Sequence, residues 1–190
     1  MELFHGTPKS RGDIIIKEKR ISCHAKPMFE DGCEDILQSA EYSDNLIKPK
    51  TLSTTPGYVY LSDLIFNAMY YGNVNAFSND EDYFYLFKVE LPEEVLEPDE
   101  DEIRMVLCKD PMNYPSVKDS LNACHSVRYN NDIISFEYCI LPAAANFSHP
   151  NSQLVRDMIN LRPRARGSAT QQNVVDLMNQ FYSNVSWIKI

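Results

Sequence analysis

Three segments of this chain carry side chains that suit the binding of a flat cationic ring. His5 precedes Gly6 at the end of an apolar start. Tyr60 and Tyr71 stand eleven positions apart, and Glu137 lies in a late apolar segment. With Tyr60 at the end of a strand and Tyr71 three turns down the next helix, both rings could line one cleft. Two aromatic faces hold a heteroaromatic ring by stacking, and a pyridinium also by cation–π attraction.

Other catalytic arrangements find less support. Cys23-His24 and Cys124-His125 are neighbours whose side chains diverge on an extended chain, so neither is a good nucleophile–base pair. No Cys-x-x-Cys or His-x-x-x-His spacing is present in the sequence, so we expect no metal site. The six glycines form no glycine-rich loop before a helix, which argues against a P-loop or a Rossmann fingerprint.

Short strands and helices must position the candidate residues. Runs of β-branched and aromatic residues that end at Gly or Pro predict strands over residues 1–5, 13–17, 58–61, 83–91 and 132–141. Ser62 or Asp63 is expected to cap a helix that Gly72 ends, and helical periodicity returns at 152–161 and 170–182. Residues 22–56 are predicted to form a long loop. Together these elements predict an α+β fold.

The order and spacing of these segments resemble the ADP-ribosyltransferase superfamily, in its His-Tyr-Glu branch, which includes the poly-ADP-ribose polymerases and the rifamycin-modifying transferases. Leu3-Phe4-His5-Gly6-Thr7, followed by Gly12-Asp13-Ile14-Ile15, is similar to the opening of the rifamycin-type enzymes. Tyr58-Val59-Tyr60-Leu61-Ser62-Asp63, with Tyr71 after it, resembles the polymerase strand and helix that hold two stacking tyrosines. Phe136-Glu137-Tyr138-Cys139-Ile140 resembles the polymerase strand of the catalytic glutamate. The resemblance covers residues 1–16, 57–91 and 132–142.

The resemblance implies a split mixed or antiparallel β-sheet of the ADP-ribosyltransferase type in residues 1–150, with residues 151–190 as a C-terminal helical extension packed on it. It implies a glycosyltransferase that binds NAD as a substrate and transfers ADP-ribose to an acceptor with release of nicotinamide. His5 would hydrogen-bond the adenine-side ribose, the two tyrosines would stack the nicotinamide ring, and Glu137 would lie by the nicotinamide ribose. The residues expected to contact NAD are His5, Gly6, Thr7, Tyr60, Ser62 and Tyr71.

The identity of the catalytic carboxylate stays open between two segments. In the rifamycin-type enzymes the third triad member is an aspartate shortly after the central strand, and Asp99 or Asp101 has a similar place here. We favour Glu137, because an unpaired carboxylate in an apolar strand is costly and calls for a reason. Residues 93–102 bear seven acids and no base, and we interpret them as a solvated loop.

Two alternative functions remain. An RNA 2′-phosphotransferase-like enzyme would share the His-Gly-Thr opening, but that family is expected to have a histidine where Tyr60 stands. A catalytically silent module that binds NAD or ADP-ribose, or an inhibitor protein with the same fold, would keep the binding residues without turnover. The acceptor of an active enzyme could be a protein, a nucleic acid or a small molecule.

Charge and hydropathy limit which partners the protein can bind and where in the cell we expect it. The formal net charge is −9, which repels nucleic acid and anionic membranes. A local exception would be the arginine cluster of Arg156, Arg162, Arg164 and Arg166. The start lacks a secretory signal pattern and no apolar run is long enough for a membrane helix, so we expect a cytoplasmic protein or an effector exported without a cleavable signal.

Overall fold

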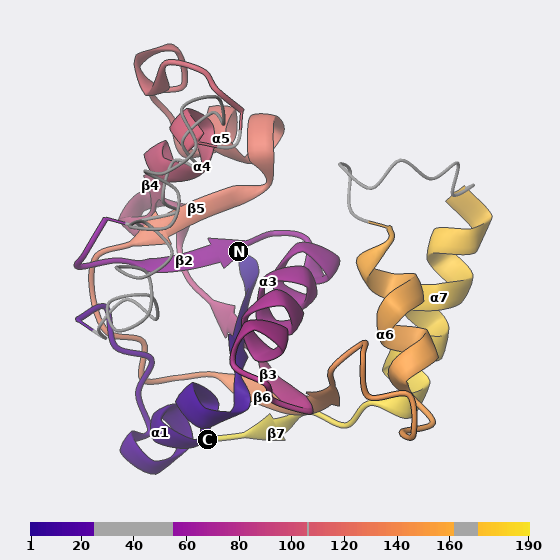
Figure 1. Cartoon of the computed structure of the whole chain (residues 1–190). Coiled ribbons are helices and arrows are strands. Elements are labelled where there is room, and N and C mark those ends of the chain that lie inside the picture. The colour runs from indigo at the N-terminus through magenta and orange to yellow at the C-terminus, as the bar shows by residue number, and fades with distance from the viewer. Residues whose placement is uncertain (25–54, 106, 162–170) are drawn as a thin grey trace, which may run out of the picture.

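One antiparallel sheet organises the chain, which is therefore α+β as expected. The computed structural model describes residues 1–24, 55–105, 107–161 and 171–190. Its strands are β1 (Glu2–Pro8), β2 (Val59–Ser62), β3 (Tyr83–Glu90), β4 (Glu97–Pro98), β5 (Ser126–Tyr129), β6 (Glu137–Pro142) and β7 (Ile188–Lys189). They lie in the order β4-β5-β2-β1-β3-β6-β7 (Figure 1), and every neighbouring pair is antiparallel.

Helices cover both faces of this sheet. The described part of the chain contains α1 (Lys9–Glu18), α3 (Ile65–Ser78), α4 (Glu100–Met105), α5 (Val117–Cys124), α6 (Ser152–Ile159) and α7 (Gln171–Asn184), with short 3-10 turns η1 (Glu93–Val95) and η2 (Pro111–Asn113). Even-numbered residues of β3 pack in a cluster with α3, α6 and α7, and odd-numbered ones pack with α1, α5 and β5. Strand alternation thus gives the sheet two apolar cores, one on each face.

The sheet opens between β1 and β2. β1 pairs with β3 along its whole length. With β2 it shares one pair of Cα partners among the described residues, Phe4 and Ser62. From His5 onward, the described backbone of β1 has its strand partner on the β3 side. His5 therefore lies where the sheet begins to separate.

Two glycines let α3 lie directly on β1. A Cβ atom on Gly6 would fall 1.8 Å from the carbonyl oxygen of Ala68 and 2.9 Å from the backbone nitrogen of Gly72. A Cβ atom on Gly72 would fall 2.6 Å from the ring of Phe84. The prediction that Gly72 ends this helix is therefore wrong. The helix continues to Ser78, and Gly72 is needed for the close approach of the two elements.

The predicted strand over residues 13–17 is also wrong, because these residues belong to α1. Ile15 is buried in the core that also contains the odd-numbered residues of β3. Gly12 lies so close to the Tyr85 ring that a Cβ atom would fall 2.0 Å from it. β-branched residues carry only a slight helix penalty, which the burial of Ile15 outweighs.

Residues 93–102 do not form the solvated loop that their acidity predicts. They form η1, β4 and the start of α4. Asp99 and Asp101 are 3% and 7% exposed. Hydroxyl and amide donors surround both carboxylates, which is what makes their burial tolerable.

Several other predictions are confirmed. Strands over 1–5, 58–61 and 83–91 correspond to β1, β2 and β3, and the two late helices correspond to α6 and α7. The strand predicted over 132–141 starts later, at Glu137, and Ile133 makes an isolated bridge with Ile21. The sequence reading missed α5 and β5. Most of the loop predicted over 22–56 lies outside the described residues.

The C-terminal helices pack on the sheet's own core. Leu154 of α6 and Phe181 of α7 belong to the same buried cluster as Phe84 of β3. The chain then returns to the sheet, where β7 pairs with β6 at the edge through Glu137 and Lys189. Figure 1 shows α6 and α7 side by side, and β7 next to β6 at the edge of the sheet.

Candidate functional site

His5 joins two of the predicted site segments. Its Nδ1 lies 2.9 Å from the carbonyl oxygen of Tyr60, and its ring centre lies 6.3 Å from that of Phe87. Because a carbonyl oxygen only accepts hydrogen bonds, Nδ1 carries the proton and donates it. This hydrogen bond crosses the opening between β1 and β2 and fixes the orientation of the imidazole.

The environment keeps the His5 imidazole neutral. Desolvation lowers the pKa of His5 from 6.5 to about 4, despite the hydrogen bond to the Tyr60 carbonyl, which raises it. The nearby positive charge of Arg11 on α1 lowers this pKa further. At pH 7 the Nε2 atom therefore bears a lone pair, and it can accept a hydrogen bond from a group such as a sugar hydroxyl.

Tyr60 is held at its hydroxyl end by an acid of α4. The hydroxyl donates to the carboxylate of Asp101, which also accepts from the Thr55 backbone N–H at 2.7 Å and from the Thr55 hydroxyl at 2.9 Å. Burial, followed by the hydrogen bond to Asp101, raises the pKa of Tyr60 above its ordinary value. Tyr60 therefore stays protonated, with its hydroxyl committed to Asp101.

Tyr71 is held in the same way by the next residue of α4. Its hydroxyl lies 2.9 and 3.0 Å from the two carboxylate oxygens of Glu102. Its ring packs edge-on against Tyr70, with centroids 5.3 Å apart. We refer to residues 99–102 as the acidic turn. Both tyrosines predicted to form the clamp thus end on this one turn.

Asp99 caps the helix that the acidic turn begins. One carboxylate oxygen accepts from the backbone N–H of Glu102 at 2.9 Å, and the other accepts from the Ser126 hydroxyl at 2.5 Å. Burial raises the pKa of Asp99 to about 6. These contacts give Asp99 a structural task at the start of α4 and beside β5.

Glu137 is placed apart from His5 and Tyr60. It is the first residue of β6, and its Cα partner on β3 is Lys88, which in turn pairs with Phe4 of β1. With strands about 4.8 Å apart, the Glu137 backbone lies roughly 10 Å from β1. The structure therefore brings His5 and Tyr60 together directly, but it does not bring Glu137 into contact with them.

The assumption that Glu137 is an unpaired carboxylate is wrong. Its Oε2 lies 2.6 Å from the Nζ of Lys88, and both side chains are partly buried. Lys88 also lies over the Trp187 ring, 5.0 Å from its centre. The ion pair explains how an apolar strand tolerates this acid, so burial alone no longer favours Glu137 over the acidic turn.

Two residues expected to contact NAD have structural partners. The Ser62 hydroxyl donates to the His125 carbonyl at 2.6 Å and accepts from the Leu64 N–H at 3.1 Å, so it holds the turn between β2 and α3. Thr7 is buried in β1 opposite Tyr85 of β3. Gly6 of β1, in contrast, faces the backbone of α3 at the opening of the sheet.

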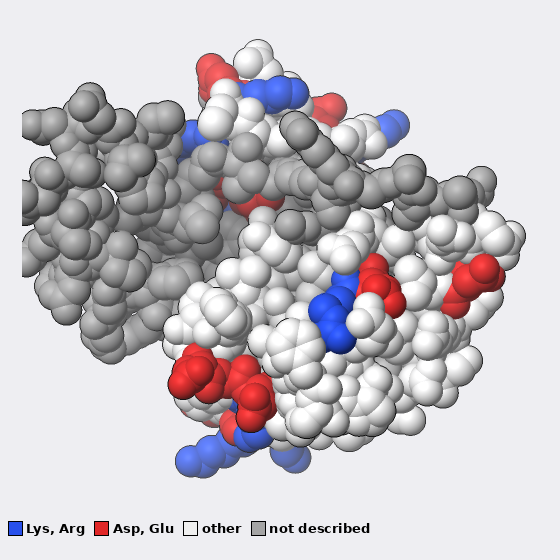
Figure 2. Space-filling view, turned by 45° about the vertical axis from the view of Figure 1, so that its right-hand side comes forward, with Lys and Arg blue, Asp and Glu red and all other residues white. Residues whose placement is uncertain are grey.

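The arginine cluster is described only at Arg156. Its guanidinium donates to the carbonyl oxygen of Ala144 at 2.5 Å and so helps to anchor α6. Arg162, Arg164 and Arg166 lie outside the described residues. In the view of Figure 2, most of the described surface is uncharged, and the basic groups are scattered over it without forming one patch.

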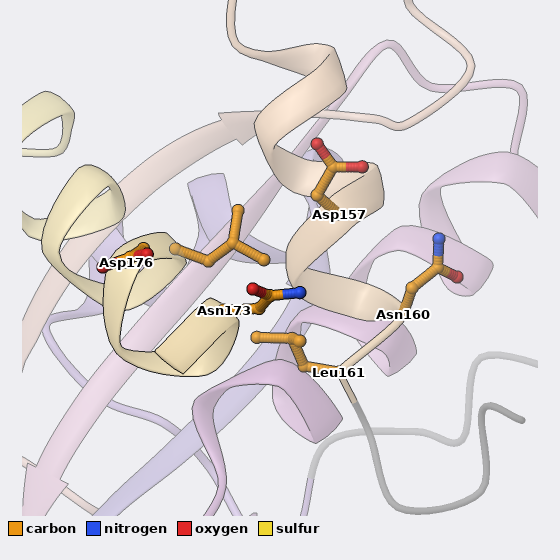
Figure 3. A pocket seen from close by; sticks show the side chains of 6 residues that line it. Asp157, Asn160, Leu161, Asn173 and Asp176 are labelled. Atoms are coloured by element: carbon orange, nitrogen blue, oxygen red, sulfur yellow. The ribbon is translucent and has the colours of Figure 1, made fainter. Parts of the chain in front are cut away.

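Two pockets lie away from the residues predicted to contact NAD. One, of about 320 Å³, lies between α6 and α7 (Figure 3). The other, of about 430 Å³, lies beside the start of α1. No residue predicted to contact NAD lines either pocket. Within the parts of the chain that the structure describes, no group of three or more His, Cys, Asp or Glu side chains could hold a metal ion.

The sequence reading missed Glu102 as a partner of Tyr71. A signal was present, because Asp99 followed three positions later by Glu102 is the pattern of a capped helix start. That pattern would have placed the acids on a short helix, although it could not have named their tyrosine partners.

No family model, no curated protein and no solved structure matches this chain. Across the described residues, the helices are too short or too polar to cross a bilayer.

Proposed function

We propose that this protein transfers ADP-ribose from NAD to an acceptor and releases nicotinamide. The hydrogen bond from His5 to the Tyr60 carbonyl supports this most directly, because it joins two segments of the His-Tyr-Glu resemblance where β1 and β2 separate. The second stacking tyrosine of the resemblance, Tyr71, precedes Gly72, which packs against Gly6 at the same opening. Two segments that are distant in sequence, the start of the chain and residues 57–91, thus meet at Gly6.

Each residue has a distinct task in this proposal. The nicotinamide ring stacks between Tyr60 and Tyr71, and the backbone of Gly6 binds its amide. The neutral His5 accepts a hydrogen bond at Nε2 from a hydroxyl of the adenine-side ribose. Because the strand order is β2-β1-β3-β6, Glu137 approaches the ligand from the side of β1 opposite Tyr60.

The reaction exchanges one bond at the anomeric carbon of the nicotinamide ribose. The bond from this carbon to the ring nitrogen breaks, and its electron pair leaves with nicotinamide, which becomes neutral. Positive charge develops on the ribose, and the carboxylate of Glu137 stabilises it. The acceptor's nucleophile then bonds to the same carbon and loses its proton to solvent.

Calorimetric NAD binding and nicotinamide release by the purified protein test this proposal. Tyr60→Ala should weaken NAD binding about twofold to tenfold, because ring stacking is worth about 0.5–1.5 kcal/mol beyond area burial. Tyr60→Phe keeps the ring and should have a milder effect. Tyr114→Ala is a control, because that ring contacts Lys109 at η2.

The outcomes separate the alternatives. Labelled NAD added to a cell extract should transfer its label to an acceptor, whose identification gives the substrate class. Binding of NAD without nicotinamide release, with or without extract, would indicate a silent NAD-binding module. A protein that neither binds NAD nor releases nicotinamide would contradict the proposal.

A further inference from the structure

The acidic turn holds the outer ends of two aromatic rings that come from different elements. Asp101 accepts from the hydroxyl of Tyr60 on β2, and Glu102 accepts from the hydroxyl of Tyr71 on α3. Asp101 and Glu102 are adjacent on α4, so one rigid turn sets the positions of both tyrosine hydroxyls. The sequence reading treated Asp101 as a rival catalytic carboxylate and did not consider Glu102.

We propose that Asp101 and Glu102 are positioning residues that fix the spacing and tilt of Tyr60 and Tyr71 for a bound nicotinamide ring. This inference rests on the proposed function. The acidic turn orders the two tyrosine rings before NAD binds. Another carboxylate stabilises the charge that develops in the reaction.

The anchoring of the turn supports this role. Asp99 caps α4, its own N–H donates to the Ser120 hydroxyl at 2.9 Å, and Ile103 is fully buried. A turn fixed in this way is a firm support for the hydroxyls it holds. Rings that are already ordered lose less conformational freedom when a ligand binds, so pre-organisation improves affinity.

The hydrogen bonds of Asp101 argue against a direct catalytic role. Both carboxylate oxygens are occupied: one by the Tyr60 hydroxyl and the Thr55 N–H, the other by the Thr55 hydroxyl. An acid used in this way acts on the substrate through Tyr60. Its effect should appear in NAD binding and in KM more than in kcat.

Glu102 gives the sharper test, because it is less buried than Asp101 and its replacement puts folding at less risk. Glu102→Ala removes the acceptor for the Tyr71 hydroxyl, whereas Glu102→Gln removes the charge but keeps a carbonyl oxygen that accepts. Glu102→Ala should raise KM and the dissociation constant for NAD roughly threefold to tenfold, the size of one ordinary hydrogen bond, with kcat nearly unchanged. Glu102→Gln should restore most of the loss.

Three further variants separate the effect of the hydrogen bond from that of charge. In a Tyr71→Phe background, Glu102→Ala should have no additional effect, because the hydroxyl it serves is already absent. Glu94→Gln is the charge control, since it removes an exposed acid of η1 just before the acidic turn. Asp101→Asn should weaken NAD binding in the same direction, and a thermal melt shows whether that protein remains folded.

A readout without NAD tests the geometry separately. In protein labelled with 3-fluorotyrosine, the fluorine resonance that disappears in Tyr71→Phe should shift in Glu102→Ala and stay in place in Glu94→Gln. Equal losses in Glu102→Ala and Glu102→Gln would overturn the inference, because charge would then be what matters. Unchanged NAD binding in Glu102→Ala, beside an active wild type, would also overturn it. An inactive wild type that does not bind NAD would instead show that the proposed function fails.

Discussion

Residues 97–102 carry five carboxylates, and the side chains around them explain how the fold tolerates so many. Arg128 is 7% exposed, lies across the strand pair from Tyr60, and contacts Glu97 and Glu100 at 3.4 and 3.2 Å. Its guanidinium also lies over the ring of Tyr58, 4.3 Å from the centre. Each acid in this region thus has a cation or a hydroxyl beside it, and the mutual repulsion of the carboxylates is offset.

Glu137 and Lys88 form a matched pair for a test of the catalytic acid. If Glu137 stabilises charge as nicotinamide leaves, Glu137→Gln should lower kcat by about 10²–10³ with little change in NAD affinity. Lys88→Met breaks the same ion pair but keeps the carboxylate, so its kcat should fall far less. Nicotinamide release at saturating NAD measures both.

The comparison between the two variants decides the role of Glu137. Equal losses of kcat and of thermal stability in Glu137→Gln and Lys88→Met would mean that the ion pair is structural. A normal Glu137→Gln enzyme beside an inactive but folded Asp101→Asn enzyme would move the catalytic acid to the acidic turn.

Asp99 should make stability depend on pH in a defined direction. Its folded-state pKa of about 6 exceeds the ordinary value of 3.8, so its proton favours the folded state below pH 4, and this contribution is lost as the pH rises through 6. An asparagine does not titrate, so the Asp99→Asn protein does not lose stability in this way as the pH rises. Relative to wild type, its free energy of unfolding should rise on the order of 2–3 kcal/mol from pH 4 to pH 7. Urea unfolding at the two pH values measures the difference, with the exposed Asp176→Asn as control. A difference independent of pH would contradict the raised pKa.

At the scale of elements, the contact between α3 and β1 sets the geometry of the opening. Gly6→Ala would place a methyl group on the Ala68 carbonyl, so α3 must move away. Such overpacking typically costs about 1–3 kcal/mol, and backbone yields less readily than a side chain. Because Tyr71 moves with α3, NAD binding should weaken together with stability. Urea unfolding and calorimetry check the two effects.

Gly72 provides a comparison for the stability cost of Gly6→Ala. Gly72→Ala meets the Phe84 ring rather than backbone, and a ring can shift, so its cost should be smaller than that of Gly6→Ala. A Gly6→Ala protein as stable as wild type would mean that α3 and β1 are not in close contact.

At the scale of the whole molecule, the C-terminal helices and the sheet share one core. Phe181 of α7 is fully buried in the cluster that contains Phe84 of β3. Phe181→Ala should therefore cost about 3–5 kcal/mol, as large-to-small changes in a core do. Val175→Ala, on the same helix but largely exposed, should change stability by less than about 0.5 kcal/mol.

Two probes show whether this core unfolds as one unit. Trp187 is the one tryptophan of the chain, so its fluorescence follows the C-terminal segment, while far-UV circular dichroism follows all helices and strands. The two urea transitions should coincide. A fluorescence transition at lower urea would make residues 151–190 a separately unfolding appendage.

Local patterns in the sequence determined much of this molecule. Aromatic runs predicted β1, β2 and β3, and apolar periodicity predicted α6 and α7, because burial on one face is written into the spacing of residues. The His5-Gly6 and Tyr60 segments were identified for the same reason: a strand end and a strand-to-helix turn are local features. The α+β class followed from these elements.

Tertiary structure alone decided the partners of the chemical groups. The composition of residues 93–102 predicts solvation, and only the donors from Thr55, Tyr60 and Ser126, which are distant in sequence, permit the burial of Asp99 and Asp101. The proton on His5 Nδ1 and the ion pair of Glu137 likewise depend on strand register. A carboxylate or imidazole takes its charge state from the groups around it, and those groups are brought together only when the sheet forms.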